Sequence, residues 1–547
     1  MTRNIIFKSI SVLLLISQGF SILNSQSSRL FDISKNIEIY TNVYKELNKN
    51  FVDEIDPGIL MKTGIEAMTK SLDPYTVYYS ESEAESYRIS MEGKYSGIGT
   101  VMKNVDSVIT IADLYKDSPA YKAGLRIGDK LLEVNGKSTA GKSSSDISTI
   151  VRGAPGTEIE FKVQSYGENS VKSVKVIRGE IKIPNVPFKG MINDSIAYIQ
   201  LTTFTENAGD NVKIALKALK DSFNVKGLIL DLRDNGGGLL REAINVSNVF
   251  IDNDKDLVFT RGKVEDQNKT YKTTRNAFDT ELPLAVLIND KSASASEIVA
   301  GSIQDLDRGV LVGQKSFGKG LVQNFFPSGY NSKVKMTISR YYIPSGRCIQ
   351  SKTYENGKAI LIDKNKQSEF KTKNGRRVYD VGGVEPDVEV SRPDKKSYIQ
   401  NLIKDNVIFK YANDYILRNK NIRLEEKFTF TQYDDFKDFL KKNAYTYKSQ
   451  PEVKLEELKN SLLEEKSDIK IETEISGLNS LIENIKNEDE ISSVEIIKNL
   501  IKKEILLRLY LPDNGIRYIL HDDPEIVKAV EILGDQTQYK KILNILN

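Results

Sequence analysis

Short apolar runs alternate with segments of helical periodicity between about residues 190 and 345. The apolar runs, which we interpret as strands, are residues 196–204, 225–232, 283–288 and 309–313. The segments between them that have helical spacing are residues 211–222, 239–250 and 295–305. Alternation of strands with helices over this length predicts an α/β core with a mixed sheet.

The pattern differs on both sides of this core. Residues 29–90 have helical periodicity that breaks at Asp73-Pro74, and residues 93–180 read as short strands with one or two helices. From about residue 395 glycine becomes rare and leucines recur at helical spacing, as in Leu455, Leu458 and Leu462. The sequence therefore predicts a multidomain α+β chain. Its predicted segments are 1–27 (signal peptide), 28–92 (N-terminal helical region), 93–180 (small β domain), 181–392 (α/β core) and 393–547 (C-terminal helical domain).

Residues 1–27 have the composition of a targeting segment. Arg3 and Lys8 precede an apolar stretch, residues 10–23, which Ser, Gln and Gly interrupt. The stretch is too short and too polar for a confident membrane span, so we interpret it as a secretory signal of an exported, periplasmic or envelope-associated protein. No Ala-x-Ala cleavage site is evident, and an uncleaved segment would act as a membrane anchor.

Charge and cysteine content narrow the classes of function. The 547 residues contain 78 Lys and Arg against 75 Asp and Glu, a net charge of +3, so we predict no nucleic-acid partner. The single cysteine, Cys348, excludes an intrachain disulfide and any multi-cysteine metal site. We predict no metal and no cofactor.

A serine-rich turn joins the third apolar run to the helix that follows it. The turn reads Ser292-Ala-Ser-Ala-Ser296, and its small residues leave a serine hydroxyl uncovered near the positive end of a helix. This is a suitable position for a nucleophile. Taken alone, the turn is equally typical of a flexible loop.

A nucleophilic serine needs a base, and the choice is limited. The one histidine, His521, lies 227 residues after Ser294 (521 − 294) in a charged helical tail, which disfavours a Ser-His-Asp triad. Lysine is the other candidate, and Lys319 follows an apolar strand between Gly318 and Gly320. Burial would have to lower its pKa by roughly three units, at about 4 kcal/mol, for it to be neutral near pH 7.

The segment around this lysine has a competing interpretation. Residues 313–319 have the Gly-x-x-x-x-Gly-Lys spacing of a phosphate-binding loop, but Gly320 stands where a Ser or Thr must reach magnesium. A nucleotide site is therefore disfavoured. A surface bend is the plainer alternative for Gly-Lys-Gly by itself.

Taken together, these motifs resemble a known family. The run Ser292 to Gly301, then Gln304-Asp305, then Phe317-Gly-Lys-Gly-Leu-Val-Gln323 is similar to the core signature of the carboxy-terminal processing, or tail-specific, proteases. The resemblance covers about residues 35–390 and implies a serine-lysine dyad. Ser294 would be the nucleophile and Lys319, 25 positions later (319 − 294), the base. Gln323 would orient the lysine, and Asp305 is a weaker supporting candidate that also reads as a structural charge at a helix end.

A glycine run follows the second apolar strand. Residues 233–238 read Arg-Asp-Asn-Gly-Gly-Gly, and consecutive glycines at a strand end can turn backbone N–H groups toward an oxyanion. The resemblance implies that Gly237 or Gly238 pairs with the N–H of Ala295 in an oxyanion hole. The usual family motif has proline at Gly236, so the choice between the two glycines stays open.

Residues 93–180 resemble a PDZ domain. The loop Ser96-Gly97-Ile98-Gly99 matches the glycine loop that holds a peptide carboxylate, and Arg152-Gly153 to Gly156-Thr157 supports the match. A lone Gly-Ile-Gly would be an ordinary tight turn. The PDZ resemblance implies that substrate tails bind there.

Two classes of function follow. The first is an exported serine endopeptidase that captures proteins with accessible C-termini, with an adaptor protein as a further candidate partner. The alternative is a catalytically inactive PDZ scaffold that only binds. The sequence selects neither an oligomeric state nor a natural substrate.

Overall fold

The computed structural model describes residues 29–363, 365, 367–391, 397–419, 428–464, 472–509 and 520–545. The predicted signal peptide lies outside these residues. The chain divides into two compact units, of which unit 1 takes in residues up to Ser80 with Phe325–Met336 and Tyr354–Ala359, and unit 2 the rest. Among the residues described, no helix is both long and apolar enough to cross a membrane.

Unit 1 contains helices, the short strand β1 and two segments of later strands, Phe325–Met336 and Tyr354–Ala359. Residues 29–50 are helical, followed by α2 (Pro57–Lys70) and β1 (Val77–Tyr79). Asp56 caps α2 by accepting hydrogen bonds from Gly58 N at 2.7 Å and Ile59 N at 3.0 Å. Within the unit, β1 pairs antiparallel with β18 (Ser332–Tyr342), placing Val77 opposite Lys335.

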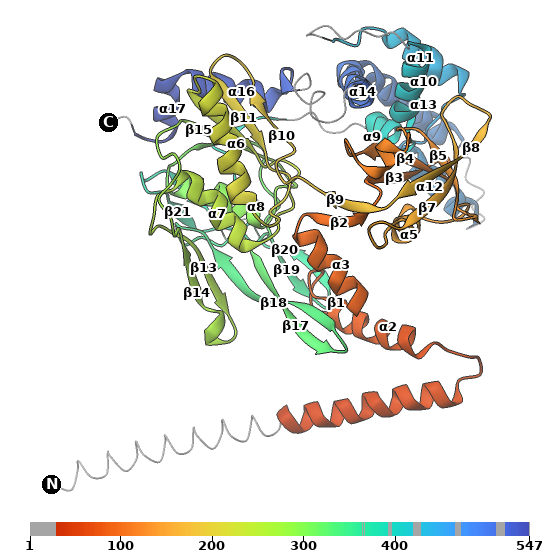
Figure 1. The fold of residues 1–547 in the computed structure, drawn as a ribbon, viewed down its shortest axis with the longest axis horizontal. Helices are drawn as coiled ribbons and strands as arrows, with labels where there is room; N and C mark the ends of the chain where they lie inside the picture. The colour runs from red at the N-terminus through yellow and green to blue at the C-terminus, as the bar shows by residue number, and fades with distance from the viewer. Residues whose placement is uncertain are drawn as a thin grey trace, which may run out of the picture. The chain divides into compact units, whose positions relative to one another are not determined.

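The centre of unit 2 is a six-stranded sheet with the order β10-β11-β12-β15-β16-β23. Figure 1 labels its strands β10, β11 and β15. Its strands are β10 (Phe188–Met191), β11 (Ile196–Gln200), β12 (Gly227–Asp231), β15 (Leu284–Ile288), β16 (Val310–Gly313) and β23 (Val388–Glu389). Only the pairing of β10 with β11 is antiparallel within this order. The connecting helices are α6 (Ala208–Ser222), α7 (Leu240–Phe250) and α8 (Ala295–Asp305). The predicted α/β core with a mixed sheet is confirmed.

Both faces of this sheet are covered, so β12 and β15 are buried along their whole length. Side chains on one face of the sheet, such as Leu228 and Leu230, pack with α6, α7 and α8. Side chains on the other face, such as Ile229 and Leu287, pack with the last two helices of the described chain. These helices are α16 (Pro524–Gly534) and α17 (Gln536–Ile542), drawn in blue in Figure 1.

A second, antiparallel set of strands follows the central sheet in unit 2. β13 (Asp256–Gly262) pairs with β14 (Lys269–Lys272) and with β18, where Phe259 lies opposite Tyr342. The remaining short elements of the chain are η1 (Glu265–Gln267), β17 (Leu321–Gly329), β19 (Lys352–Glu355), β20 (Lys358–Leu361), β21 (Glu369–Lys371) and β22 (Arg377–Tyr379). Parts of β17, β19 and β20 belong to unit 1.

The small β domain is a sheet with the order β3-β4-β5-β7-β8 and β6 beside β5. Its elements are β3 (Thr100–Val105), β4 (Val108–Leu114), α4 (Pro119–Lys122), β5 (Lys130–Val134), β6 (Lys137–Ser138), α5 (Ser144–Val151), β7 (Glu158–Gln164) and β8 (Val171–Ile177). Alternate residues of β7, such as Ile159 and Phe161, enter its apolar core. α3 (Glu81–Met91) precedes the domain, and β2 (Lys94–Gly97) pairs antiparallel with β9 (Gly179–Lys182) where the chain enters and leaves it.

The C-terminal helices belong to two different hydrophobic clusters. The first cluster contains α9 (Ser397–Lys404), α10 (Val407–Arg418), α11 (Tyr433–Lys442) and α14 (Val494–Leu509), with α12 (Gln450–Glu464) and α13 (Glu472–Ser492) alongside. Within unit 2, α10 also contacts β3 and the turn after it, since Lys103 Nζ lies 3.6 Å from the Phe409 ring centroid and Lys410 Nζ 2.9 Å from Asp106. α16 and α17 instead belong to the cluster under the central sheet.

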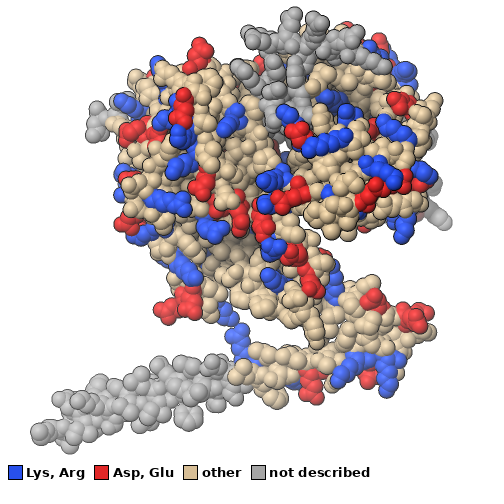
Figure 2. Space-filling view, in the orientation of Figure 1, with Lys and Arg blue, Asp and Glu red and all other residues tan. Residues whose placement is uncertain are grey.

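The surface carries side chains of both charges, as the composition predicts. On the face in Figure 2, Lys and Arg side chains are interspersed with Asp and Glu side chains over the described residues. This distribution is consistent with the net charge of +3.

Candidate active site

The serine run and the glycine run meet at the carboxyl ends of two neighbouring parallel strands, β15 and β12. Backbone hydrogen bonds join the two loops directly, from Ala293 N to Asn235 O at 3.0 Å. The Ser296 hydroxyl donates to the same carbonyl at 2.8 Å. The structure therefore brings together two predicted segments that lie almost sixty residues apart (294 − 235 = 59).

Ser294 differs from the two other serines of its run. It stands at the N-terminus of α8 with φ 56° and ψ −110°, a strained backbone for a residue other than glycine, and it is half-buried. Ser292 and Ser296 are fully buried, and their hydroxyls donate to the carbonyls of Leu232 and Asn235, each at 2.8 Å. The turn therefore presents the middle serine and uses its neighbours as supports.

A buried carboxylate links Ser294 to the loop that carries Lys319. Glu297 Oε2 accepts hydrogen bonds from Ser294 N at 2.8 Å and from Lys319 N at 2.9 Å. Glu297 Oε1 accepts from Gly318 N and from the Ser316 hydroxyl, both at 2.6 Å. Burial raises the pKa of Glu297 above its usual range, although these donors oppose the shift. One side chain thus fixes the backbone positions of both predicted dyad residues.

The glycine before Lys319 is required by close packing. Gly318 has φ 84°, and a Cβ built there would lie 2.5 Å from the Ser351 Cβ. Lys319 itself is half-buried. The predicted glycine-flanked turn therefore brings the lysine backbone close to the neighbouring chain, which a larger residue at position 318 would prevent.

Gly237 lies directly against the nucleophile turn. A Cβ built on it would lie 3.0 Å from both Ala295 N and Ser294 Cβ, and its φ is 101°. Its N–H donates to Asn235 Oδ1 at 2.9 Å. Gly238 lies opposite Phe204 in an isolated β-bridge. Its hydrogen bonds run from Phe204 N to Gly237 O and from Leu239 N to Phe204 O, so the bridge does not use the Gly238 N–H. Of the two candidate oxyanion donors, the Gly237 N–H is therefore bonded within its own loop, whereas the Gly238 N–H takes no part in the bridge.

Two other predicted residues have partners elsewhere in the site. Gln323, on β17, donates from Nε2 to Thr337 Oγ1 at 3.3 Å. Asp305 is buried at the end of α8, where its carboxylate pairs with Arg347 at 2.7 Å and accepts from Ser345 N at 2.9 Å. These bonds favour the structural interpretation of Asp305.

His521 has no part in the contacts of Ser294. It is exposed, and the adjacent Asp522 pairs with Lys502 at 2.8 Å.

The predicted carboxylate loop of the small β domain divides into two parts. Ser96 and Gly97 are paired with β9, whereas Ile98 is fully buried and Gly99 has φ 79°. A cavity of about 200 Å³ adjoins the loop. Its lining includes Ile98, Thr100 and Met102 on one side and Ser148, Val151 and Arg152 of the α5 region on the other. This is the position of a peptide groove between a strand and a helix.

Three supporting residues were not predicted from the sequence. Asn235 is fully buried and donates to Leu201 O at 2.8 Å. Glu297 joins the Ser294 and Lys319 loops, and the Tyr341 hydroxyl donates to Ser294 O at 3.2 Å. The Ser294-x-x-Glu297 spacing of a helix capping box was a usable signal for Glu297. The bonds from Asn235 to Leu201 and from Tyr341 to Ser294 had no local signal, because these partners lie 34 and 47 residues away.

The chain matches three family descriptions, each over a different segment. Residues 195–360 match "Peptidase family S41", residues 110–165 match "PDZ domain", and residues 398–533 match "Probable PDZ-protease, C-terminal helical domain".

Curated relatives agree with these matches. A carboxy-terminal-processing protease of Bartonella bacilliformis is 32% identical over 358 residues, covering 64% of this chain and 81% of the relative. Probable CtpA-like serine proteases of Staphylococcus haemolyticus and Staphylococcus aureus are 35% and 32% identical, with 56% and 71% of this chain and 62% and 70% of the relatives covered. The solved photosystem II D1 C-terminal processing protease is 25% identical, covers 59% of this chain and 91% of its own, and has a TM-score of 0.34.

Proposed function

We propose, from the premise that this chain belongs to peptidase family S41 and is a serine peptidase with a PDZ domain, that it cleaves protein tails through an acyl-enzyme on Ser294. The observation that carries the proposal is the position of Ser294. It is the half-buried member of its serine run, at a strained turn before a buried helix, and Glu297 ties it to the Lys319 loop.

In the proposed mechanism Lys319 is the general base. The neutral amine accepts the proton of the Ser294 hydroxyl as the Oγ attacks the scissile carbonyl, and it returns the proton to the leaving amine. Water then hydrolyses the acyl-enzyme with the same lysine as base. Gln323, on the strand that follows Lys319, is proposed to orient the lysine. Asp305 is proposed to support α8 through Arg347 rather than to contact substrate.

The oxyanion would lie between the N–H of Ala295 and that of a glycine in the opposite loop. We favour Gly238 as the second donor, because the Gly237 N–H is already bonded to Asn235 Oδ1. Gly237 has a different proposed role. Its missing side chain leaves room in front of Ala295 N, where a Cβ would lie 3.0 Å away.

Substrate capture is assigned to the PDZ groove. The cavity beside Ile98 and Gly99 has apolar walls from Met102 and Val151, and the loop offers backbone N–H groups for a free C-terminal carboxylate. The proposed substrates are proteins or peptides with accessible C-termini that enter as an added strand. Residues 1–27 support the proposal of an exported enzyme. The domain limits 28–92, 93–180, 181–392 and 393–547 remain our proposal for this architecture.

The test compares two serines of the same turn. Ser294→Ala should abolish reaction with a serine-directed fluorophosphonate and cleavage of an unfolded protein, with the thermal unfolding transition retained. Ser292→Ala is the comparison variant. It removes a buried hydroxyl that donates to Leu232 O at 2.8 Å and accepts from Asn289 N at 2.9 Å, so it should lose stability but keep probe labelling and cleavage. An inactive scaffold would leave the wild-type chain unlabelled. Labelling that survives in Ser294→Ala but is lost in Ser292→Ala would show that we have named the wrong serine.

A further inference from the structure

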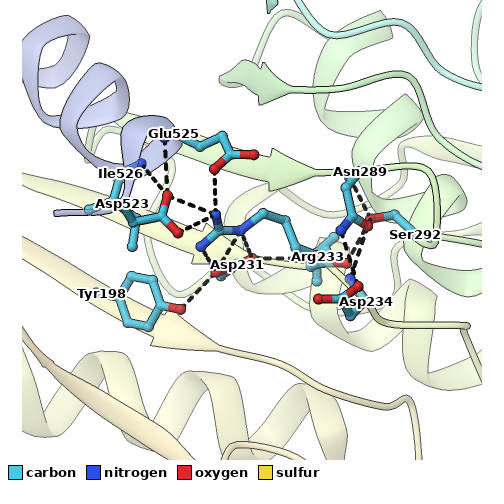
Figure 3. Close-up of polar contacts among 10 residues, drawn as sticks. Tyr198, Asp231, Arg233, Asp234, Asn289, Ser292, Asp523, Glu525 and Ile526 are labelled. Carbon is cyan, nitrogen blue, oxygen red and sulfur yellow. Dashed lines mark hydrogen bonds and ion pairs between the residues drawn. The ribbon is translucent and has the colours of Figure 1, made fainter. Parts of the chain in front are cut away.

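A buried cluster of charges lies at the end of β12, directly before the glycine loop (Figure 3). Its centre is the Arg233 guanidinium, whose side chain is only 8% exposed. Arg233 Nε donates to both carboxylate oxygens of Asp231 at 3.0 Å, and Nη2 donates to Asp231 Oδ2 at 2.6 Å. The Tyr198 hydroxyl of β11 donates to the same carboxylate at 2.7 Å.

The other two carboxylates come from the opposite end of the chain. Arg233 Nη1 donates to both oxygens of Asp523 at 2.8 Å and to Glu525 Oε2 at 2.9 Å. Asp523 is also the N-cap of α16, accepting from Glu525 N at 3.0 Å and Ile526 N at 3.2 Å. The Glu525 side chain is fully buried. Burial tends to raise the pKa of Asp523, but Arg233 and the cap donors hold it below its ordinary value.

Burying these charged groups to attach a helix to a sheet costs desolvation free energy that apolar packing does not. Apolar side chains of similar size often replace a buried ion pair without loss of stability, because desolvation of the charges offsets their attraction. Apolar packing is also available here, since Ile526, Ala529 and Ile532 of α16 already bury against the sheet. Stability alone therefore does not explain three carboxylates around one guanidinium.

The cluster does determine how the chain leaves β12. Arg233 N donates to Asp231 Oδ1 at 2.9 Å, so the same carboxylate holds both the main chain and the side chain of Arg233. The next residue, Asp234, turns left-handed with φ 60°, and its N–H donates to Asn289 Oδ1 at 3.0 Å. Asn235 follows and accepts from Ala293 N. The glycine loop is therefore held on the nucleophile side by asparagines and on the strand side by Arg233.

We propose that Asp523 and Glu525 are positioning residues for the peptidase reaction, which hold the glycine loop against Ser294 and Ala295 through Arg233. The inference rests on the proposed function. α16 then belongs to the catalytic unit, although its residues do not touch the substrate. Loss of either carboxylate loosens the strand end from which the loop departs, and so weakens stabilisation of the oxyanion more than it weakens substrate binding.

The experiment uses the full-length chain with Asp523→Asn and Glu525→Gln. Both variants keep the size of the side chain, and the amide introduced by Asp523→Asn would still offer an oxygen to the α16 cap. Asp535→Asn is the matched control, because Asp535 stands at the other end of α16 and caps α17 by accepting from Thr537 N at 2.9 Å and Gln538 N at 3.0 Å. The measurements are kcat per fluorophosphonate-titrated site, KM, and the Ki of a peptide aldehyde, whose hemiacetal oxygen occupies the oxyanion position.

The expected result separates positioning from stability. Asp523→Asn and Glu525→Gln should each lower kcat per titrated site about tenfold and raise the aldehyde Ki by a similar factor, less than the loss on deleting an oxyanion donor. KM should change less than about twofold, since uniform substrate binding is not affected. Asp535→Asn should leave all three constants unchanged even where its unfolding temperature falls.

Two results would overturn the proposal. The first is an unchanged kcat per titrated site in both variants, with only a lower unfolding temperature, which would mean that the cluster is purely structural. The second is a raised KM with kcat retained. A wild-type chain that does not react with the probe would instead refute the proposed function, and this inference with it.

Discussion

Replacement of Glu297 by glutamine tests the connection between the Ser294 and Lys319 loops, which we propose are catalytic. The carboxylate accepts four hydrogen bonds, two on each oxygen, and all four donors are backbone N–H groups or a serine hydroxyl. In Glu297→Gln one oxygen becomes an NH₂ group. If the NH₂ group faces Ser294 N and Lys319 N, both of these backbone donors lose their acceptor. If it faces Gly318 N and the Ser316 hydroxyl, Gly318 N loses its acceptor, whereas the hydroxyl can rotate.

Each buried donor left without an acceptor costs about 1–3 kcal/mol. The better orientation therefore predicts a loss of at least about 1–3 kcal/mol in the free energy of unfolding, and the chain can recover part of it by moving one loop away from Glu297. Such a shift separates Ser294 from the Lys319 loop. Because small misplacements of reacting groups cost about 100-fold in rate, we expect kcat to fall on that order.

The assay pairs kcat per titrated site with the free energy of unfolding in urea. Glu242→Gln is a matched control, since Glu242 is also a buried helical glutamate that accepts a backbone hydrogen bond, from Gly209 N at 3.1 Å, but belongs to α7. It should lose stability while keeping kcat. If Glu297→Gln retains full kcat, or if Glu242→Gln lowers kcat as much, the reasoning about Glu297 is refuted.

The raised pKa of Glu297 adds a dependence on pH. Because the folded-state pKa lies above the ordinary 4.5, the folded chain binds this proton more tightly than the unfolded chain. The cost of burying the charge is fully present above the folded pKa and is relieved as pH falls through it toward 4.5. Protonation of Glu297 also removes a hydrogen-bond acceptor from the Ser294 and Lys319 loops. Activity should therefore fall over a pH range in which this group's contribution to stability rises, and Glu297→Gln should lack that step.

Three further predictions concern the dyad, the groove and the glycine loop. Lys319→Arg should fold but lose activity at every pH below about 12, because guanidinium cannot accept the serine proton, whereas His521→Ala should keep wild-type activity; the reverse result would exclude a lysine base. A peptide substrate with an amidated C-terminus should be captured more weakly than its free-acid form, as measured by KM, and equal values would remove the PDZ groove from substrate selection. Gly237→Ala should reduce kcat at least about 100-fold, the size of a lost oxyanion donor, since its Cβ would lie 3.0 Å from Ala295 N; Gly236→Ala, whose added Cβ meets no atom within 4 Å, is the control and should stay active.

The sequence predicted those parts of the molecule that have a local pattern. Apolar runs and helical spacing were enough for β12, β15, α7 and α8, since both faces of a covered parallel sheet leave continuous hydrophobic strands. The serine turn and the glycine run were found in the same way, and family resemblance assigned roles to Ser294 and Lys319. The structure adds the reason why Ser294 is the half-buried serine of its run: the hydroxyls of Ser292 and Ser296 are buried and donate to backbone carbonyls.

What the sequence did not predict depends on contacts between distant segments. Nothing near Asp523 or Glu525 indicates that they reach Arg233, 290 and 292 residues earlier. The helical spacing of the tail placed 393–547 in one domain, but periodicity does not say which surface a helix covers, and α16 packs under the central sheet. The segment Ser96 to Gly99 was predicted as the glycine loop of a PDZ domain. Nothing local indicated that Ser96 and Gly97 would pair with β9, which lies more than eighty residues later (180 − 96 = 84).

The cover that α16 and α17 give to the central sheet has a consequence for biosynthesis. Ile229 and Leu287 face helices that begin only at residue 524, and 232 residues separate Ile288 from Leu520 (520 − 288). At about 5–20 residues per second, a ribosome needs on the order of 10–50 seconds to make that stretch. Throughout this interval the helices that cover this face of the sheet have not been synthesised, so they cannot bury its apolar side chains. The apolar core on this side of the sheet is therefore completed only after α16 and α17 have been synthesised.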